Sequence, residues 1–161
     1  MNNEILKEIL IRQLDKEPIP YELLLDADPS MEAIEKYLPF SEIHVGTLKS
    51  KVIGTIVLYP LNANELEIKN IAVEESLQGN GIGGLMLKYA TEIAIVKRAK
   101  SLVIGTANSS VAQLYLYQKN GFETTGIKQN FFLDNYPLPV FEKRYTMQAF
   151  DHAGKAVMNI E

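Results

Sequence analysis

The chain has 161 residues, a formal net charge of −4, and 47% hydrophobic and 22% charged residues, which fits a single globular domain spanning residues 1–161. No apolar run approaches the ~20 residues that cross a bilayer, and the acidic balance leaves no basic patch for nucleic acid, so we expect a soluble cytoplasmic protein with neither membrane nor nucleic acid as partner. The absence of cysteine excludes disulfides, a cysteine nucleophile and cysteine-ligated zinc.

The first part of the chain reads as short helices that lead into a β-hairpin. The segment EILIRQLD fits either a strand or the end of a short helix, and its periodicity leaves both open. Residues 20–38 read as helix, broken near DADPS, where Pro29 is a stop and Ser30 a new cap. The segment EIHVGTLKSKVIGTIVLYPL is typical of a hairpin with its turn at KSK.

The next strand, ELEIKNIAV, changes its apolar parity halfway. Leu66 and Ile68 share one face, whereas Ile71 and Val73 fall on the other. One extra residue inserted around residues 69–70, a β-bulge, would turn both pairs to the core. The alternative is a strand buried on both faces after Ile68, and the pattern leaves the two open.

Helix and strand alternate in the remainder of the chain. After a glycine-rich loop, apolar residues recur at helical spacing on one face: Ile82, Leu85, Met86, Tyr89, Ile93 and Val96. SLVIGTA is apolar enough for the centre of a sheet, and SSVAQLYLYQKNGF predicts a helix that begins near a serine cap and is stopped by Gly121. FETTGIKQNFFL and FEKRYTMQAF are predicted final strands around the loop DNYPLPV. The order predicts a mixed α/β fold.

The glycine-rich loop SLQGNGIGG is the main functional signal. Gly79, Gly81, Gly83 and Gly84 leave backbone N–H groups accessible at the start of a helix, a combination that binds phosphate. Gly79-x-Gly81-x-x-Gly84 also matches the dinucleotide fingerprint, but the acid that this fingerprint requires at the next strand is missing from VIGTAN. No Gly-Lys-Ser/Thr follows, so the loop is not a Walker A motif.

In another frame, Gln78-x-x-Gly81-x-Gly83 resembles the Q/R-x-x-G-x-G/A signature of the GNAT acetyltransferase superfamily. The flanking segments IAVEESLQGNGIG and NSSVAQLYLYQKNGF extend the resemblance over about residues 65–122. The resemblance implies a GNAT-like acyl-CoA N-acyltransferase fold, in which helices flank a central mixed β-sheet. It also implies an N-acetyltransferase that uses acetyl-CoA as co-substrate.

The resemblance further implies which residues bind the cofactor. In the family a backbone N–H at the end of the strand is the usual oxyanion donor, and the loop binds the pyrophosphate. Asn108 and Ser110 match positions that contact cofactor or ordered water, although both also suit a helix cap. The implied cofactor-binding set is Ile71, Ala72, Val73, Gln78, Gly79, Asn80, Gly81, Ile82, Gly83, Gly84, Asn108 and Ser110.

Acetyl transfer to an amine requires a base for the amine proton and benefits from an acid for the leaving thiolate. Glu67, six residues before Val73, matches a strand glutamate of several family members and is the predicted base; Glu65 or a water chain are the alternatives. Equally, both carboxylates fit an ordinary outward face of a half-exposed strand. Without cysteine, direct attack of the amine in a ternary complex is the simplest route.

Tyr117, four residues before Gly121, matches the tyrosine that serves as acid in the family. It falls outside the predicted apolar arc of Val111 and residues 114–116, so it is either exposed or directed into a cleft. His44 and His152 are far apart and in no ligand-like spacing, which argues against a metal site and a Ser-His-Asp triad.

The acceptor is not identified by the sequence. Between residues 22 and 42 six acids stand against Lys36 alone, which indicates either a solvated helix face or an entrance that attracts a cationic amine, small molecule or peptide. The aromatic segment NFFLDNYPLPVF either lines an acceptor pocket or covers a sheet edge. The alternative function is a catalytically inactive CoA-binding regulatory or interaction module. A homodimer is compatible with either function.

Overall fold

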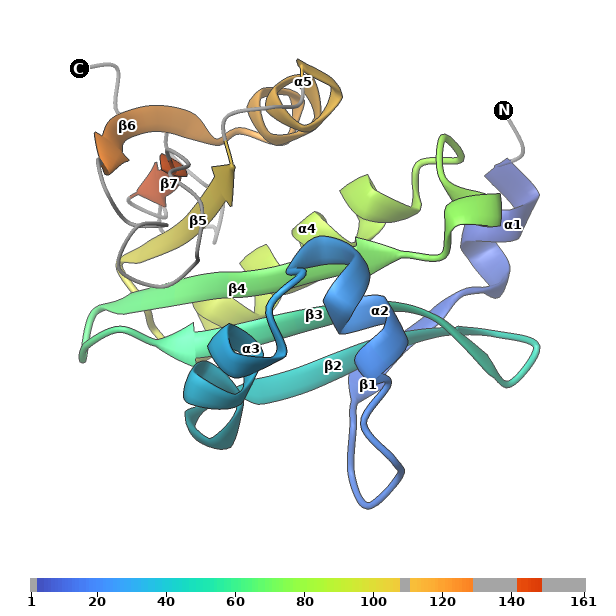
Figure 1. Cartoon of the computed structure of the whole chain (residues 1–161). Helices are drawn as coiled ribbons and strands as arrows, with labels where there is room; N and C mark the ends of the chain where they lie inside the picture. The colour runs from blue at the N-terminus through green and yellow to red at the C-terminus, as the bar shows by residue number, and fades with distance from the viewer. Residues whose placement is uncertain (1–2, 108–110, 129–141, 149–161) are drawn as a thin grey trace. The chain divides into compact units, whose positions relative to one another are not determined.

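The structure, a computed structural model, describes residues 3–107, 111–128 and 142–148 (Figure 1). The chain contacts define two compact units. Unit 1 comprises the residues up to Tyr59 together with Lys69–Ala90, and unit 2 comprises Pro60–Ile68 and the residues from Thr91 onward. Each unit is described by itself. A single domain over residues 1–161 stays a prediction.

The sheet of unit 1 has the strand order β1-β2-β3-β4. Strand β1 (Leu10–Gln13) pairs antiparallel with β2 (Glu42–Leu48), and β2 pairs antiparallel with β3 (Lys51–Pro60). Lys49 and Ser50 form the β2–β3 turn with φ of 49° and 67°. Positive φ at both positions is typical of a two-residue hairpin, because it matches the twist of the strands. The predicted hairpin and its turn are confirmed.

Three short helices precede this hairpin. Helix α1 (Asn3–Glu8) is followed directly by β1, so EILIRQLD contains both the end of a helix and a strand. Helices α2 (Tyr21–Ala27) and α3 (Met31–Tyr37) are separated at the predicted break, and Ser30 Oγ accepts the Ala33 N–H at 3.1 Å. A 3₁₀ turn, Leu38–Phe40, leads into β2. The predicted stop and cap are confirmed.

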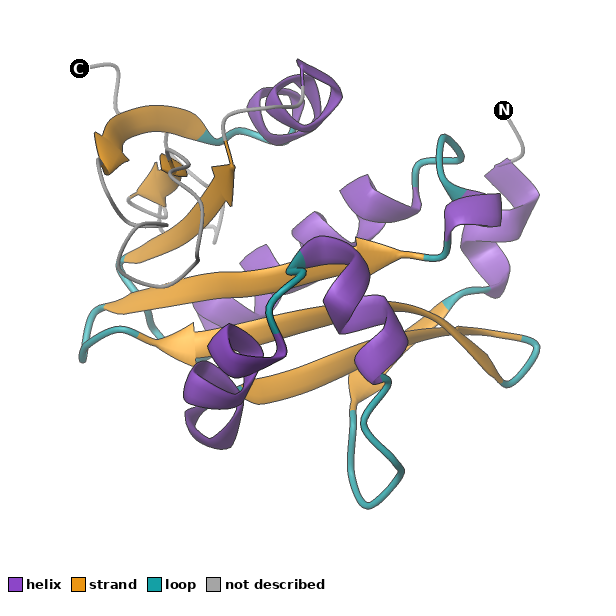
Figure 2. Cartoon of the chain, viewed as in Figure 1, coloured by secondary structure: helices purple, strands orange, loops and turns teal. Residues whose placement is uncertain are grey.

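Helices cover both faces of the β2–β3 hairpin within unit 1 (Figure 2). On one face Leu24, Ile34 and Leu38 from α2, α3 and the 3₁₀ turn pack with Val57 of β3. On the other face lies α4 (Ile82–Val96), whose Met86 contacts the backbone at Gly54. Burying apolar side chains on both faces is what holds these elements together.

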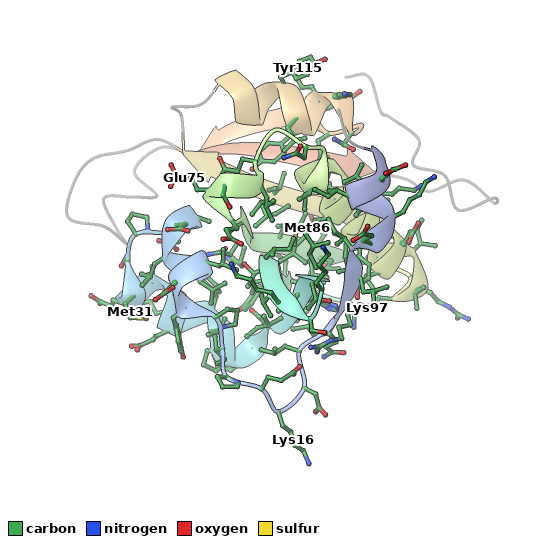
Figure 3. The ribbon with its side chains drawn as sticks, turned by 90° about the vertical axis from the view of Figure 1, so that its right-hand side faces the viewer. Lys16, Met31, Glu75, Met86, Lys97 and Tyr115 are labelled. Carbon is green, nitrogen blue, oxygen red and sulfur yellow. The ribbon has the colours of Figure 1, made fainter. Side chains whose placement is uncertain are left out.

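Helix α4 buries a face that differs at one end from the predicted stripe. Ile82 and Met86 are buried, as are Leu87, Ala90 and Ala94, and Figure 3 shows Met86 among interior side chains. Val96, which the periodicity placed on the core face, is 77% exposed. The helix ends at this residue, and its buried face ends with Ala94.

The sheet of unit 2 has the strand order β4-β5-β7-β6. Residues Glu65–Ile68 of β4 (Glu65–Val73) run parallel to β5 (Ser101–Ala107). Strand β7 (Glu142–Gln148) pairs antiparallel with both β5 and β6 (Glu123–Lys128). Because parallel and antiparallel pairs meet at β5, the sheet is mixed. The predicted mixed fold with flanking helices is confirmed, and SLVIGTA is an interior strand.

Helix α5 (Val111–Lys119) of unit 2 precedes β6. Tyr115, predicted on its apolar arc, is 66% exposed and points outward in Figure 3, whereas Tyr117 is buried at 3%. The predicted arc is therefore wrong for Tyr115, because the fold buries Tyr117 instead. Among the described helices none is long and apolar enough to cross a membrane.

Candidate active site

Two consecutive side chains of β4 point to the same face of the strand. Lys69 Nζ lies 5.2 Å from the centroid of the Tyr59 ring. Tyr59 shares the face of Val57, two residues earlier, which packs against α2 and α3. The next residue, Asn70, donates hydrogen bonds to a carbonyl of α2 and a hydroxyl of α3. Successive residues of a regular strand point to opposite faces, so one residue is extra here.

The backbone hydrogen bonds give the same result. The Leu61 N–H donates to the Glu65 carbonyl at 2.9 Å, and the Glu74 N–H donates to the Ile53 carbonyl at 2.8 Å. On β3 these bonds are eight residues apart, whereas on β4 they are nine residues apart. The predicted insertion near residues 69–70 is confirmed. The bulge does not turn Ile71 and Val73 to the core as predicted, because both are half-buried and Ala72 between them is buried.

The glycine loop follows β4 through a 3₁₀ turn, Glu75–Leu77. Gly79 and Gly81 have φ of 82° and 85°, a region that other L-residues rarely adopt. The Gln78 side chain donates to the Val73 carbonyl at 3.0 Å, and the Asn80 side chain donates to the Leu77 carbonyl at 2.9 Å. The loop is therefore held by hydrogen bonds of its own side chains.

The N-terminus of α4 presents free backbone donors. The first hydrogen bond of this turn joins the Leu85 N–H to the Gly81 carbonyl at 3.1 Å. Within the described ranges, the N–H groups of Ile82, Gly83 and Gly84 have no recorded acceptor. Such donors, at the positive end of a 15-residue helix, favour an anion.

The two candidate bases on β4 differ in their surroundings. The Glu65 carboxylate accepts the Asn62 amide at 2.8 Å and the Ser101 hydroxyl at 3.2 Å, at the turn where β4 begins. Glu67 is paired in register with Val103 and is only 4% exposed. The interpretation of both as outward carboxylates is thus wrong for Glu67. A buried carboxylate requires a specific reason.

Tyr117 is 3% exposed, and its ring lies 6.3 Å from that of Phe122. The alternative of a surface tyrosine is therefore wrong. Asn108, Ser110 and the aromatic segment NFFLDNYPLPVF lie outside the described residues.

The acidic segment is mostly a solvated surface, because Glu22, Asp26, Glu32 and Glu35 are exposed. Glu42 is half-buried, and Asp28 is buried at 8% exposure, with its Oδ1 accepting the Ser30 N–H at 3.1 Å.

The buried ring of His44 contacts two neighbouring polar side chains. Its Nδ1 lies 2.7 Å from Tyr89 Oη, its Nε2 lies 3.2 Å from Glu42 Oε2, and the ring is buried. Burial raises the pKa of Tyr89, and the negative charge of Glu42 adds to the effect. Over the part of the chain that the structure describes, no three His, Cys, Asp or Glu residues are grouped to hold a metal ion.

Sequence reasoning missed a polar cluster beside the bulge. Asn70 Nδ2 lies 2.9 Å from the Leu24 carbonyl and 3.2 Å from Tyr37 Oη, and Tyr37 in turn bonds Asp28. Burial raises the pKa of Tyr37, and the Asp28 carboxylate adds to this, against the opposing effect of the Asn70 bond. The one signal in the sequence was an asparagine in an apolar strand; its partners lie 33 and 46 residues away.

Comparison with known proteins identifies the family. Residues 39–124 match the model of the acetyltransferase (GNAT) domain. The chain is 42% identical, over 76% of its length and 79% of the relative, to the uncharacterized N-acetyltransferase YvbK of Bacillus subtilis. A GNAT family acetyltransferase from Elizabethkingia anophelis, solved with acetyl-CoA bound, has 47% identity and a TM-score of 0.85, over 88% of this chain and 98% of that structure. A Bacillus subtilis acetyltransferase in complex with CoA has 34% identity and a TM-score of 0.79, over 87% and 98%. The chain belongs to the GNAT acetyltransferase family.

Proposed function

We propose that this protein is an N-acetyltransferase that moves an acetyl group from acetyl-CoA to a primary amine by direct attack in a ternary complex. The proposal rests on one arrangement: a bulged strand, β4, leads into a glycine loop, and helix α4 begins after the loop. The first N–H groups of α4 lack acceptors within the described ranges. The start of such a helix can bind the phosphate end of a long thioester cofactor. The bulged strand can pair with the other end, which carries the acetyl group. The Elizabethkingia relative with acetyl-CoA bound supports this choice of cofactor.

The backbone of Gly79–Gly84 is the proposed binding site of the pyrophosphate. Gln78 and Asn80 contribute mainly by fixing the loop, because their amide nitrogens already bond its carbonyls. Residues Ile71–Val73 are the proposed seat of the acetyl end, where a strand N–H faces the thioester carbonyl and stabilises the oxyanion that forms there. Phosphate binding and oxyanion stabilisation would thus both use main-chain donors.

Glu67 is the proposed base. Its burial is the supporting observation, since the Glu65 carboxylate is already bonded to Asn62 and Ser101. Glu67 takes a proton from the acceptor ammonium, directly or through water, and the amine lone pair attacks the thioester carbon. The carbon–sulfur bond breaks, and the Tyr117 hydroxyl gives its proton to the leaving thiolate. The nitrogen loses its second proton, which restores the Tyr117 hydroxyl, and Glu67 releases the first proton to water. The products are an N-acetylated amine and CoA.

The acceptor is proposed to be a cationic amine, either a small molecule or a peptide. The supporting observation is the row of exposed carboxylates on α2 and α3, only one of which, Glu32, is bridged to Lys36 at 3.7 Å. Such a row raises the local concentration of cations at low ionic strength.

Calorimetric titration with acetyl-CoA, with NADH as the control, tests the cofactor. Micromolar binding of acetyl-CoA and none of NADH is expected, whereas binding of NADH alone would overturn the proposal. Release of free thiol from acetyl-CoA over a panel of amines then tests turnover. Binding without thiol release for any amine would favour an inactive CoA-binding module instead.

A further inference from the structure

The polar cluster beside the bulge connects β4 to both helices that precede the hairpin. Asn70 is 4% exposed, and its Nδ2 donates to the Leu24 carbonyl at 2.9 Å. This carbonyl also accepts the Asp28 N–H at 2.9 Å, at the last turn of α2. The amide of Asn70 therefore bonds the end of that helix to the bulged residue.

The second bond of the same amide runs to α3. Asn70 Nδ2 lies 3.2 Å from Tyr37 Oη. The Asp28 carboxylate raises the pKa of the Tyr37 phenol, both by its charge and as a hydrogen-bond acceptor. Asp28 Oδ1 accepts the Ser30 N–H, which precedes α3. The polar cluster therefore extends from the bulge through α3 to the junction of the two helices.

One buried polar atom of the cluster lowers the stability of the fold. Among the described residues, Asn70 Oδ1 is buried without a hydrogen-bond partner. A buried acceptor without a partner is unfavourable, and an apolar residue of similar size would avoid that cost. A polar side chain kept at such a position is therefore expected to do something other than stabilise the fold.

The position of Asn70 indicates what that is. It is the second of the two residues that share a face at the bulge, and Ile71, Ala72 and Val73 follow it directly. Their backbone direction depends on how the bulge is held, since a bulge without partners can shift along the strand. A misplacement of about 1 Å at a reacting group is enough to cost ~100-fold in rate.

We propose that Asn70 is a positioning residue: its amide fixes the β4 bulge to α2 and α3 and thereby orients the strand N–H groups toward the acetyl carbonyl. The proposal rests on the proposed function, because it assigns the acetyl end of the cofactor to this strand. Helices α2 and α3, which carry the exposed acidic residues, would then hold in place the strand that binds the acetyl group.

Titration with acetyl-CoA and with CoA, compared between variants, tests the proposal. Only acetyl-CoA carries the acetyl carbonyl that the strand N–H groups would bind. Asn70→Ala should therefore weaken acetyl-CoA binding by roughly tenfold, the worth of about one hydrogen bond, and leave CoA binding unchanged. Tyr37→Phe keeps the Leu24 bond and should weaken acetyl-CoA binding by roughly threefold in the same selective way. In turnover assays both variants should lower kcat at saturating acetyl-CoA.

Ser30→Ala is the matched control, because it removes the α3 cap but not the Ser30 N–H that Asp28 accepts. It should lower Tm by roughly 2–4 °C and change neither affinity. An equal loss for CoA and acetyl-CoA, or no selective loss in Asn70→Ala and Tyr37→Phe, would overturn the positioning role. If Asn70→Ala does not fold, Tyr37→Phe alone decides. A wild-type protein that binds neither compound would instead refute the proposed function, and the positioning role with it.

Discussion

The glycine loop and the bulged strand are adjacent in sequence but are held in different ways. In the loop, Gly79 and Gly81 supply the positive φ, and Gln78 and Asn80 bond carbonyls no more than five residues away. In the strand, Asn70 is held by Leu24 and Tyr37, which belong to other elements. The loop has a local origin, and the bulge has a tertiary one.

This difference has a functional consequence. A loop shaped by its own residues can present N–H groups to a phosphate even when distant elements move, so it suits binding. A strand shaped by distant partners transmits their displacement to the atoms that it carries, so it suits the alignment of reacting groups. Changes in the loop are therefore expected to alter the affinity for CoA and acetyl-CoA alike. Changes around the strand are expected to alter turnover, stability or the affinity for acetyl-CoA alone.

Gly81→Val should have the largest effect. A valine at φ of 85°, with its Cβ 3.4 Å from Leu6 Cδ1, would strain the loop and cover its donors. We expect acetyl-CoA affinity to fall by more than ~100-fold while the protein stays folded, as measured by calorimetry and circular dichroism. Gly79→Ala, whose added Cβ meets nothing within 4 Å, should lose less. Unchanged binding by Gly81→Val would remove the loop from the cofactor site.

Glu67→Gln should lower kcat by roughly 100-fold, the usual worth of a general base, with little change in acetyl-CoA affinity. Glu65→Gln is the isosteric control two residues away on the same strand, and it should remain close to the wild type because Glu65 serves the turn. Steady-state kinetics with saturating acetyl-CoA separate the two. Equal effects of both substitutions would point to charge in general, or to a water chain, rather than to Glu67.

Tyr117→Phe should lower kcat by roughly tenfold, less than a general base contributes, because a thiolate leaves more readily than most groups. Acetyl-CoA affinity should stay unchanged, so this α5 variant would resemble Glu67→Gln and not the loop variants. Phe keeps the ring that lies beside Phe122, so the fold should be retained. Full activity would exclude the hydroxyl from the mechanism.

The smallest effect concerns stability and compares two buried glycines of the hairpin. A Cβ at Gly54 would lie 2.8 Å from Met86 Sδ and 3.1 Å from the Ala72 carbonyl of β4, so Gly54→Ala should cost about 1–3 kcal/mol. At Gly46 the nearest atom is 3.7 Å away, so Gly46→Ala should change stability by less than about 1 kcal/mol. Urea unfolding measures both. Equal losses of unfolding free energy in the two variants would mean that β4 can shift after the bulge to make room for the added Cβ.

Much of the fold could be predicted because its signals are local. The break at residues 28–30, the hairpin turn at Lys49 and Ser50 and the limits of β4 and β5 follow from caps, turns and runs of apolar residues. The predictions that failed concern which side of an element is buried, as with Val96 and Tyr115 on helices and Glu67 on β4. Periodicity gives the direction of a side chain around a helix axis, but it does not say where the core ends.

The sequence by itself determined the glycine loop and the family, because glycine spacing and short motifs encode backbone geometry that needs no distant partner. Only the tertiary structure decided that Glu67 is buried, that Glu65 is tied to Asn62 and Ser101, and that Asn70 bonds α2 and α3. The physical reason is the same in each case: burial and hydrogen-bond partners are properties of contacts between distant segments, and spacing along one segment does not contain them.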